Sequence, residues 1–346
     1  MVSLLGPEHG IDAAAQDMEG VSTSAPQETQ IPTYSLYGDD EASLWPTPEM
    51  FHDAEVLVVD LQDVGARYYT YVWTALMAAE VALGAGLGVL ILDRPNPLGG
   101  LDAWVEGGRV ERGQESFVGF HDVAVRHGMT LAEIVTMALH ERGRVGVEGL
   151  EVIECQGWRR DMLFSDTDLP WVLPSPNMPT LETALVYPGQ CLIEGTLLSE
   201  GRGTTRPFEL FGAPFIDGER LRATLDPADF AGLGLRPVRF KPTFQKHANV
   251  SCGGLQLHVR DPRQVRSLRA TWALLRACWS LYPADCQWRT ERYEFVEDRP
   301  AVDLLAGGPW LRQMLEAGDG VGAIERSQSG ARAEFLGRRA PFLRYA

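Results

Sequence analysis

The sequence lacks the long apolar runs that a membrane-spanning protein needs. None of its 346 residues belongs to an uninterrupted apolar stretch of about 18 residues, so no transmembrane helix is predicted. The first residues also lack the order of basic, apolar and small residues that is typical of a signal peptide. We therefore expect a cytoplasmic protein without a membrane partner. Export is the alternative, if a signal segment stands upstream of this chain.

Metal-binding and disulfide patterns are absent as well. The seven histidines show no ligand spacing, and the five cysteines are odd in number and show no paired spacing. We expect unpaired thiols in a reducing compartment and no metal site. The cysteines are Cys155, Cys191, Cys252, Cys278 and Cys286.

Positive charge is scarce. The chain has 31 Lys and Arg residues against 47 Asp and Glu residues, which gives a formal net charge of −16. Binding a nucleic acid requires a positive surface, so no nucleic-acid partner is expected. Lysine occurs only at Lys241 and Lys246. The remaining bases are arginines, whose guanidinium groups suit bidentate capture of a carboxylate.

Several well-known catalytic and nucleotide-binding motifs are missing. The sequence contains no G-x-S-x-G, no H-E-x-x-H and no G-x-x-x-x-G-K. The stretch "GAGLGV" (84–89) resembles part of a dinucleotide fingerprint, but it precedes a predicted strand and lacks the third glycine. It indicates the end of a helix instead. No cofactor is therefore expected.

Strands and helices alternate in the first half of the chain. Apolar runs at 55–63, 87–100 and 150–155 predict buried strands, and 72–86 and 129–143 predict helices. The second helix is preceded by a capping box formed by Thr130 and Glu133. This alternation predicts an α/β fold with a Rossmann-like, mostly parallel sheet and helices on both faces.

The second half follows a different pattern. Residues 156–211 are rich in Pro, Gly, Ser and Thr, which predicts functional loops. Beyond them, strands at 235–244 and 253–261 and helices at 265–283, 310–318 and 323–339 predict a smaller α+β domain. We expect domains at 1–211 and 212–346. The polar stretch 22–33 is expected to form a flap near the site.

Acidic residues follow the predicted strands at their carboxyl ends. They are Glu8, Asp60, Asp63 and Asp93. Ligands of parallel sheets bind outside these strand ends, so a site is expected there, although a lone Asp at such a position often only caps a turn. Amides, hydroxyls, aromatics and arginines in nearby segments form the set of groups that binds a sugar, and the aromatics are equally consistent with a packed core. These candidates are Gln62, Arg67, Tyr69, Tyr71, Arg94, Asn96, Asn177, Glu194, Glu200, Arg202 and Thr204.

His9 directly follows Glu8. Adjacent residues of an extended segment point to opposite faces, so one of the two is expected to act on the ligand and the other to support it. We expect His9 to orient Glu8 through hydrogen bonds. A buried core histidine is the alternative.

Ordered motifs along nearly the whole chain resemble one bacterial family, the NamZ-type exo-β-N-acetylmuramidases. The matching stretches are "GPEHG" (6–10), "DLQDVGARYYTY" (60–71), "LDRPNPLGG" (92–100), "HGMTLAE" (127–133), "SPNMPT" (175–180), "YPG" (187–189), "EGTLLSEGRGTTRPFE" (194–209), "FKPTFQKHANVSCGGLQLHV" (240–259) and "PFLRY" (341–345).

The resemblance implies a glycoside hydrolase that removes terminal N-acetylmuramic acid from the non-reducing end of peptidoglycan fragments. It implies a site between a Rossmann-like domain and a smaller α+β domain, no nicotinamide cofactor, and Glu8 as the catalytic residue. The resemblance also implies a further strand and helix ahead of "GPEHG". Either the true start lies upstream of this chain, or this form has lost that strand, and its loss is expected to expose a sheet edge or leave a groove.

For this reaction we expect Glu8 to act as a general acid with a raised pKa. The 2-acetamido group of the substrate is the expected nucleophile, oriented by Asp60 or Asp63, and Glu200 is the alternative second carboxylate. The lactyl carboxylate is expected on Arg67, Arg94 or Arg202, in that order of preference. Two other functions remain open. One is a metal-dependent hydrolase that uses Glu8, His9, Asp60 and Asp93, and the other is a non-catalytic sugar-binding protein.

Overall fold

The computed structural model describes residues 1–16, 18–21, 31–144 and 148–346. The predicted flap at 22–33 falls mostly outside these residues. Within them, no helix is both long enough and apolar enough to cross a membrane. The five cysteines, all among the described residues, form no disulfide.

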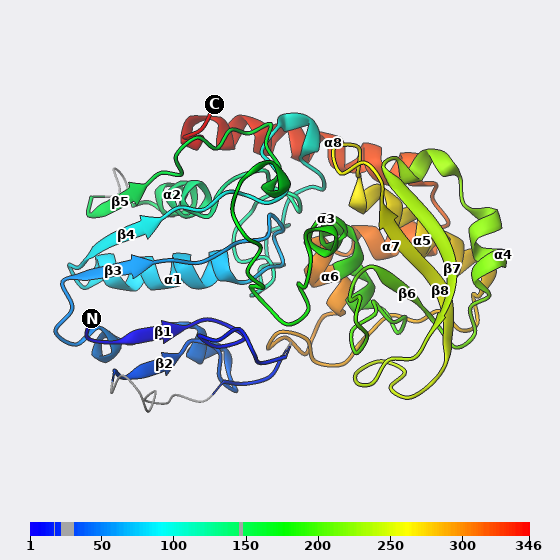
Figure 1. Ribbon diagram of the computed structural model, residues 1–346, viewed down its shortest axis with the longest axis horizontal. Helices are drawn as coiled ribbons and strands as arrows, with labels where there is room; N and C mark the ends of the chain where they lie inside the picture. Colours follow the sequence, from blue (N-terminus) through cyan, green and yellow to red (C-terminus); the bar gives the residue numbers. More distant parts are fainter. Residues whose placement is uncertain (17, 22–30, 145–147) are drawn as a thin grey trace.

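Five parallel strands form the first half of the molecule (Figure 1). Strand β1 (Leu4–Gly6) pairs with β2 (Thr33–Ser35), and β4 (Gly88–Leu92) lies between β3 (Val56–Val59) and β5 (Leu150–Ile153). The predicted parallel α/β arrangement is confirmed. The strands nevertheless fall into two groups, since no hydrogen-bonded ladder joins β1 to β3 in the described part of the chain.

Two helices pack together on one face of the three-stranded group. They are α1 (Tyr71–Gly84) and α2 (Leu131–Glu141), and the predicted capping box of Thr130 and Glu133 precedes α2. The expectation of helices on both faces is corrected here. The register places the alternate residues Val56, Val58 and Ile153 on the other face, where they are 50%, 53% and 49% exposed.

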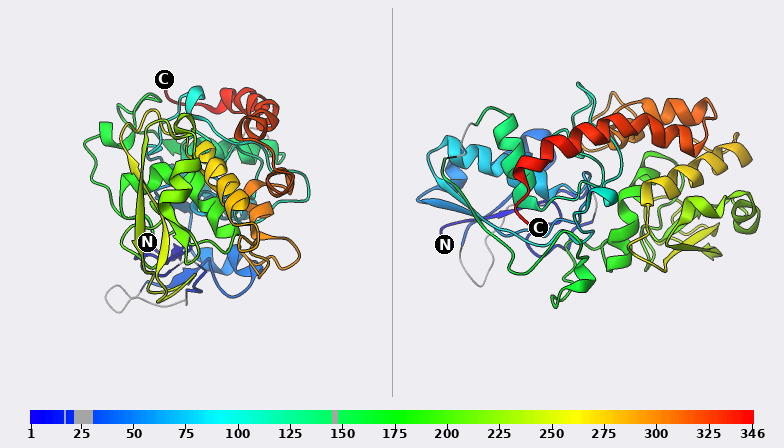
Figure 2. Two further views of the ribbon diagram at one scale, coloured as in Figure 1. Left: turned by 90° about the vertical axis from the view of Figure 1, so that its right-hand side faces the viewer. Right: turned by 90° about the horizontal axis from the view of Figure 1, so that it is seen from above.

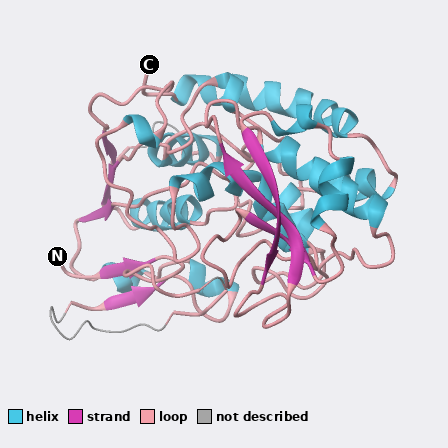
Figure 3. Ribbon diagram, turned by 45° about the vertical axis from the view of Figure 1, so that its right-hand side comes forward, coloured by secondary structure: helices cyan, strands magenta, loops and turns pink. Residues whose placement is uncertain are grey.

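The second half is built on an antiparallel sheet, which is prominent in Figure 3. Its order is β6 (Leu210–Ala213), β8 (Cys252–Val259) and β7 (Leu233–Phe240), and α5 (Ser267–Leu281) packs against α3 (Leu181–Gln190). Helix α3 lies where only loops were expected. The prediction missed it because its last turn contains Pro188 and Gly189, residues that are uncommon inside helices. The remaining helices here are α4 (Gly218–Thr224), α6 (Ala301–Ala306) and α7 (Trp310–Glu316).

Helix α8 (Val321–Arg339) joins the two halves, running from the antiparallel half back over the parallel strands (Figure 2). At its end the fully buried Arg339 donates hydrogen bonds to the carbonyl oxygens of Gly100, His127 and Gly128. These contacts anchor the end of α8 on loops of the parallel half. The domain boundary at 211/212 stays a prediction.

Candidate active site

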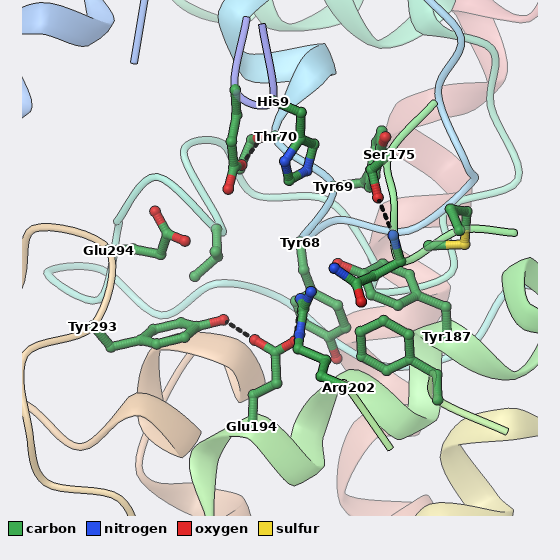
Figure 4. A pocket seen from close by; sticks show the side chains of 15 residues that line it. His9, Tyr68, Tyr69, Thr70, Ser175, Tyr187, Glu194, Arg202, Tyr293 and Glu294 are labelled. Atoms are coloured by element: carbon green, nitrogen blue, oxygen red, sulfur yellow. Dashed lines mark hydrogen bonds and ion pairs between the residues drawn. The ribbon is translucent and has the colours of Figure 1, made fainter. Parts of the chain in front are cut away.

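A pocket lies where the two halves meet (Figure 4). The turn after β1, the residues just before α1 and the segment 175–178 line it from the parallel half. The 3-10 helix η5 (Cys191–Gly195) and a turn at 293–294 line it from the other half. The lining residues are Glu8, His9, Tyr68, Tyr69, Thr70, Val118, Ser175, Asn177, Met178, Tyr187, Glu194, Arg202, Phe208, Tyr293 and Glu294.

Glu8 is the acidic residue at the carboxyl end of β1. Its side chain is buried, with 4% exposed, and Thr70 Oγ1 donates a hydrogen bond of 2.7 Å to its Oε2. Burial raises the pKa of Glu8 above the usual 4.5, against the opposing effects of this hydrogen bond and the charge of Arg202. Glu8 is therefore suited to hold a proton at a pH where an exposed glutamate has lost it.

His9 has an unusual backbone conformation. Its φ of 71° lies in the left-handed region, which a residue with a side chain adopts only at a cost. Its Nδ1 lies 2.9 Å from the carbonyl oxygen of Ala15. The left-handed turn sends the side chains of Glu8 and His9 into the same pocket, which an extended segment does not do.

Glu194 and Arg202 form a buried ion pair across the pocket from Glu8. Arg202 Nε and Nη2 donate to Glu194 Oε1 at 3.1 and 2.7 Å, and the Tyr293 hydroxyl donates to Oε2 at 2.7 Å. Burial opposes ionisation, but the charge of Arg202 and the bond from Tyr293 outweigh it, so the pKa of Glu194 is lowered. One pocket thus contains two carboxyl groups with opposite pKa shifts, a pattern typical of acid–base chemistry.

Polar and aromatic side chains complete the walls. Asn177 Nδ2 donates to Gln16 Oε1 at 2.8 Å, and its backbone N–H donates to Ser175 Oγ at 3.3 Å. The rings of Tyr187 and Phe208 meet edge to face, with centroids 4.8 Å apart. Amides and hydroxyls beside aromatic rings match the two sides of a sugar, its hydroxyl groups and its apolar ring face.

Of the predicted site residues, the structure brings together Glu8, His9, Tyr69, Asn177, Glu194 and Arg202 in this pocket. Arg67, the first choice for the lactyl carboxylate, is corrected. Its guanidinium is fully buried and donates to the carbonyl oxygens of Gly108, Val123 and Leu305. It braces the loops behind the pocket and is out of reach of a ligand.

Other predicted residues support loops near the site. Gln62 donates to the carbonyl oxygens of Asp63 and Pro95, and Asn96 donates to that of Met129. Asp63 accepts from Gly65 N–H at 2.7 Å and lies 3.4 Å from His127 Nε2, and it is not among the residues that line the pocket.

Three more predicted residues are not among those that line the pocket. The Tyr71 hydroxyl donates to Pro174 O at 2.6 Å, and Thr204 Oγ1 donates to Gly201 O at 2.6 Å. Glu200 Oε2 accepts a hydrogen bond from Lys246 Nζ at 2.8 Å. Glu200, the alternative second carboxylate, is therefore part of an ion pair with Lys246.

Asp60, Asp93 and Arg94 line a different groove, of about 560 Å³, at the ends of β3, β4 and β5. Asp60 pairs with Arg94 at 2.6 Å, and Asp93 Oδ2 accepts from the Tyr345 hydroxyl at 2.6 Å. The expectation that these acids face Glu8 is corrected, because the two groups of parallel strands end at separate places. The four ligands of the metal-dependent alternative are divided between two places, with Glu8 and His9 in the pocket and Asp60 and Asp93 at the groove. The described residues contain no cluster of three or more potential metal ligands.

Sequence reasoning missed several lining residues. Thr70, Ser175, Tyr187 and Phe208 lie inside the quoted motifs, so the motifs themselves were the signal. Glu294 and Tyr293 lie in "ERYEFVED" (291–298), which no motif covered. These two residues reach the pocket only through the three-dimensional fold, so no local sequence pattern could have identified them.

Comparisons with known proteins agree with this geometry. The chain is 40% identical over 345 residues to the peptidoglycan β-N-acetylmuramidase NamZ of Bacillus subtilis strain 168, covering all of this chain and 80% of that protein. It also resembles the crystal structures of two DUF1343 family proteins from Bacteroides fragilis. The first has a TM-score of 0.86 and 29% identity, and the match covers 100% of this chain and 86% of that one. The second has a TM-score of 0.69 and 27% identity, and the match covers 92% of this chain and 81% of that one.

Family models cover almost the entire sequence. The N-terminal model of the exo-β-N-acetylmuramidase NamZ matches residues 1–182, and the C-terminal model matches residues 185–345. The family predicted from the motifs is thereby confirmed. The chain belongs to the NamZ exo-β-N-acetylmuramidase family.

Proposed function

We propose that this protein is a glycosidase that releases terminal N-acetylmuramic acid from the non-reducing end of peptidoglycan fragments. The observation that supports this most is the buried Glu8, with a raised pKa, in one pocket with the ionised pair of Glu194 and Arg202. Glycoside hydrolysis needs a proton donor for the leaving oxygen, and a raised pKa keeps that donor protonated.

In the proposed reaction, Glu8 gives its proton to the glycosidic oxygen as the bond from that oxygen to C1 of the muramic acid breaks. Thr70 fixes the carboxyl group through Oε2. His9 supports the turn through its contact with Ala15 O. A positioned acid of this kind contributes about 10²- to 10⁴-fold to the rate.

Arg202 is the proposed partner of the lactyl carboxylate. Among the described residues that line the pocket, Arg202 is the one arginine. Its guanidinium donates two hydrogen bonds to Glu194 Oε1, which fix its position. A charge-assisted hydrogen bond to the lactyl group distinguishes muramic acid from N-acetylglucosamine, which lacks that carboxylate.

The test is to incubate the protein with the disaccharide of N-acetylmuramic acid and N-acetylglucosamine and to measure free N-acetylmuramic acid. We expect release by the parent protein and a loss of about 10²- to 10⁴-fold in Glu8→Gln. Glu49→Gln is the matched control, because Glu49 is exposed and does not line the pocket. Binding without release supports the sugar-binding alternative. Activity abolished by a chelator and restored by a divalent cation supports the metal-dependent one.

A further inference from the structure

A strained two-residue turn carries an acidic side chain into the pocket. Tyr293 N–H donates to Val296 O at 2.9 Å and Val296 N–H donates to Tyr293 O at 3.0 Å, which closes a tight hairpin around Glu294 and Phe295. Both central residues have positive φ, 46° and 68°. Tight hairpins with positive φ at both positions normally use Asn-Gly, because residues with larger side chains are strained there.

The surroundings hold the turn in this conformation. The Phe295 ring packs on those of Tyr37 and Phe117, with centroids 5.5 and 6.4 Å away. The Tyr37 hydroxyl donates to Glu294 Oε2 at 3.1 Å, and Glu294 is 3% exposed. A buried carboxylate on a strained backbone is a costly arrangement, and such arrangements concentrate at functional sites.

Two other residues that line this pocket also have a strained backbone conformation. His9 and Phe208 line it with φ values of 71° and 62°, so three lining residues other than glycine have left-handed backbone. Each is in a different segment: the turn after β1, the loop before β6 and the hairpin. The left-handed conformations aim side chains from three distant segments at one space.

We propose that Glu294 is the second carboxylate of the glycosidase reaction and that it stabilises the positive charge that develops at C1. This inference rests on the proposed function. Figure 4 shows Glu294 and Thr70, the residue bonded to Glu8, on the same pocket. Burial strengthens the interaction of an ionised carboxylate with a nearby positive centre.

The other carboxylates are less suited to this role. Glu194 accepts two hydrogen bonds from Arg202 and one from Tyr293, so its charge is largely compensated. Glu200 is paired with Lys246, and Asp60 is paired with Arg94 in the separate groove.

The proposed role requires an ionised Glu294, and the chemistry balances without a proton from it. Glu8 gives its proton to the glycosidic oxygen as the C1–O bond breaks, water supplies a hydroxyl group to C1, and the second proton of that water restores Glu8. Glu294 forms no bond in this scheme. It lowers the energy of the oxocarbenium-like transition state, so its removal affects every substrate, whatever the leaving group.

Two aryl glycosides of N-acetylmuramic acid separate the two roles. A 4-nitrophenyl group leaves without protonation, whereas a phenyl group needs it. We expect Glu8→Gln to lose far more activity on the phenyl than on the 4-nitrophenyl glycoside. Glu294→Gln is expected to lose about 10²- to 10³-fold on both. Glu297→Gln, in the same segment but with its side chain 75% exposed, is expected to match the parent protein.

Glu294→Asn is the control for a loss of activity caused by misfolding, because Asn adopts positive φ more readily than Glu or Gln. We expect it to melt no lower than Glu294→Gln and to be equally inactive. If Glu294→Gln or Glu294→Asn hydrolyses both glycosides within about threefold of the parent rate, the inference is wrong while the proposed function stands. If the parent protein releases nothing from either glycoside or the disaccharide, the proposed function fails first.

Discussion

Thr70 Oγ1 donates a 2.7 Å hydrogen bond to Glu8 Oε2, and this bond works against the burial of the same carboxyl group. Burial favours the neutral acid, whereas a donor aimed at the carboxylate favours the ionised form. Thr70 is also the residue that precedes α1, so the helix fixes the position of its hydroxyl. The pKa of Glu8 is raised overall, which means that burial prevails and Thr70 limits its effect.

Removing this hydroxyl is expected to shift the pH dependence of catalysis. In Thr70→Val the ionised form of Glu8 loses a donor, so the pKa of Glu8 rises further. A general acid works while protonated, and activity falls as pH rises through its pKa. We expect the basic limb of the kcat/KM profile to move to higher pH in Thr70→Val, with Thr74→Val, a neighbour within α1, as the control. An unmoved or downward-shifted basic limb contradicts the assignment of Glu8 as the acid.

Glu8 is also expected to lower the stability of the folded protein at neutral pH. Its pKa is raised above 4.5 on folding, so from about pH 4.5 upward the unfolded state releases its proton first. Stability therefore falls as pH rises from 4.5 through the folded pKa. Gln does not titrate, so Glu8→Gln is expected to melt higher than the parent protein at pH 7, with the difference constant below pH 4.5. Melting curves from pH 4 to 8 measure this, and a difference independent of pH refutes it.

The pair of Glu194 and Arg202 provides a test of pocket stability. Arg202→Met keeps the apolar contact with Phe208, whose ring centroid lies 5.0 Å from the guanidinium, but leaves Glu194 buried without its cation. Breaking a buried pair in this way costs about 3–5 kcal/mol. The double variant Glu194→Gln with Arg202→Met removes both charges and is expected to recover part of that loss. Urea or thermal unfolding measures it, and equal losses in the single and double variants contradict the explanation.

Much of the pocket could be predicted from sequence because its residues lie in compact motifs. "GPEHG" follows the apolar run at 2–5, and the end of that run forms the first part of β1, so Glu8 lies just beyond a strand. "SPNMPT" and "EGTLLSEGRGTTRPFE" supplied Asn177, Glu194 and Arg202, which the structure brings to the same pocket. In each case the local pattern, a strand end or a Pro- and Gly-rich loop, carried the information.

The strand-end rule failed for Asp60 and Asp93 because it assumes one continuous sheet. Adjacent strands bring their carboxyl ends together, but here β1 and β3 belong to separate groups, so the groove beside Asp60 is distinct from the pocket with Glu8. Glu294 was missed for another reason. Its position depends on positive φ at a Glu-Phe pair, which local sequence preferences disfavour and only long-range packing enforces.

The open face of the three-stranded group leads to the last prediction, which concerns stability. Val58 and Ile91 lie on paired strands but point to opposite faces, and they are 53% and 1% exposed. Ile91→Ala removes apolar volume from the core beneath α1 and is expected to cost about 2–5 kcal/mol. Val58→Thr keeps a β-branched side chain on the open face, and its effect is expected to stay within about 0.5 kcal/mol. Urea unfolding of the two variants measures the contrast. A large loss in Val58→Thr contradicts an open face, because it shows that Val58 is covered in solution.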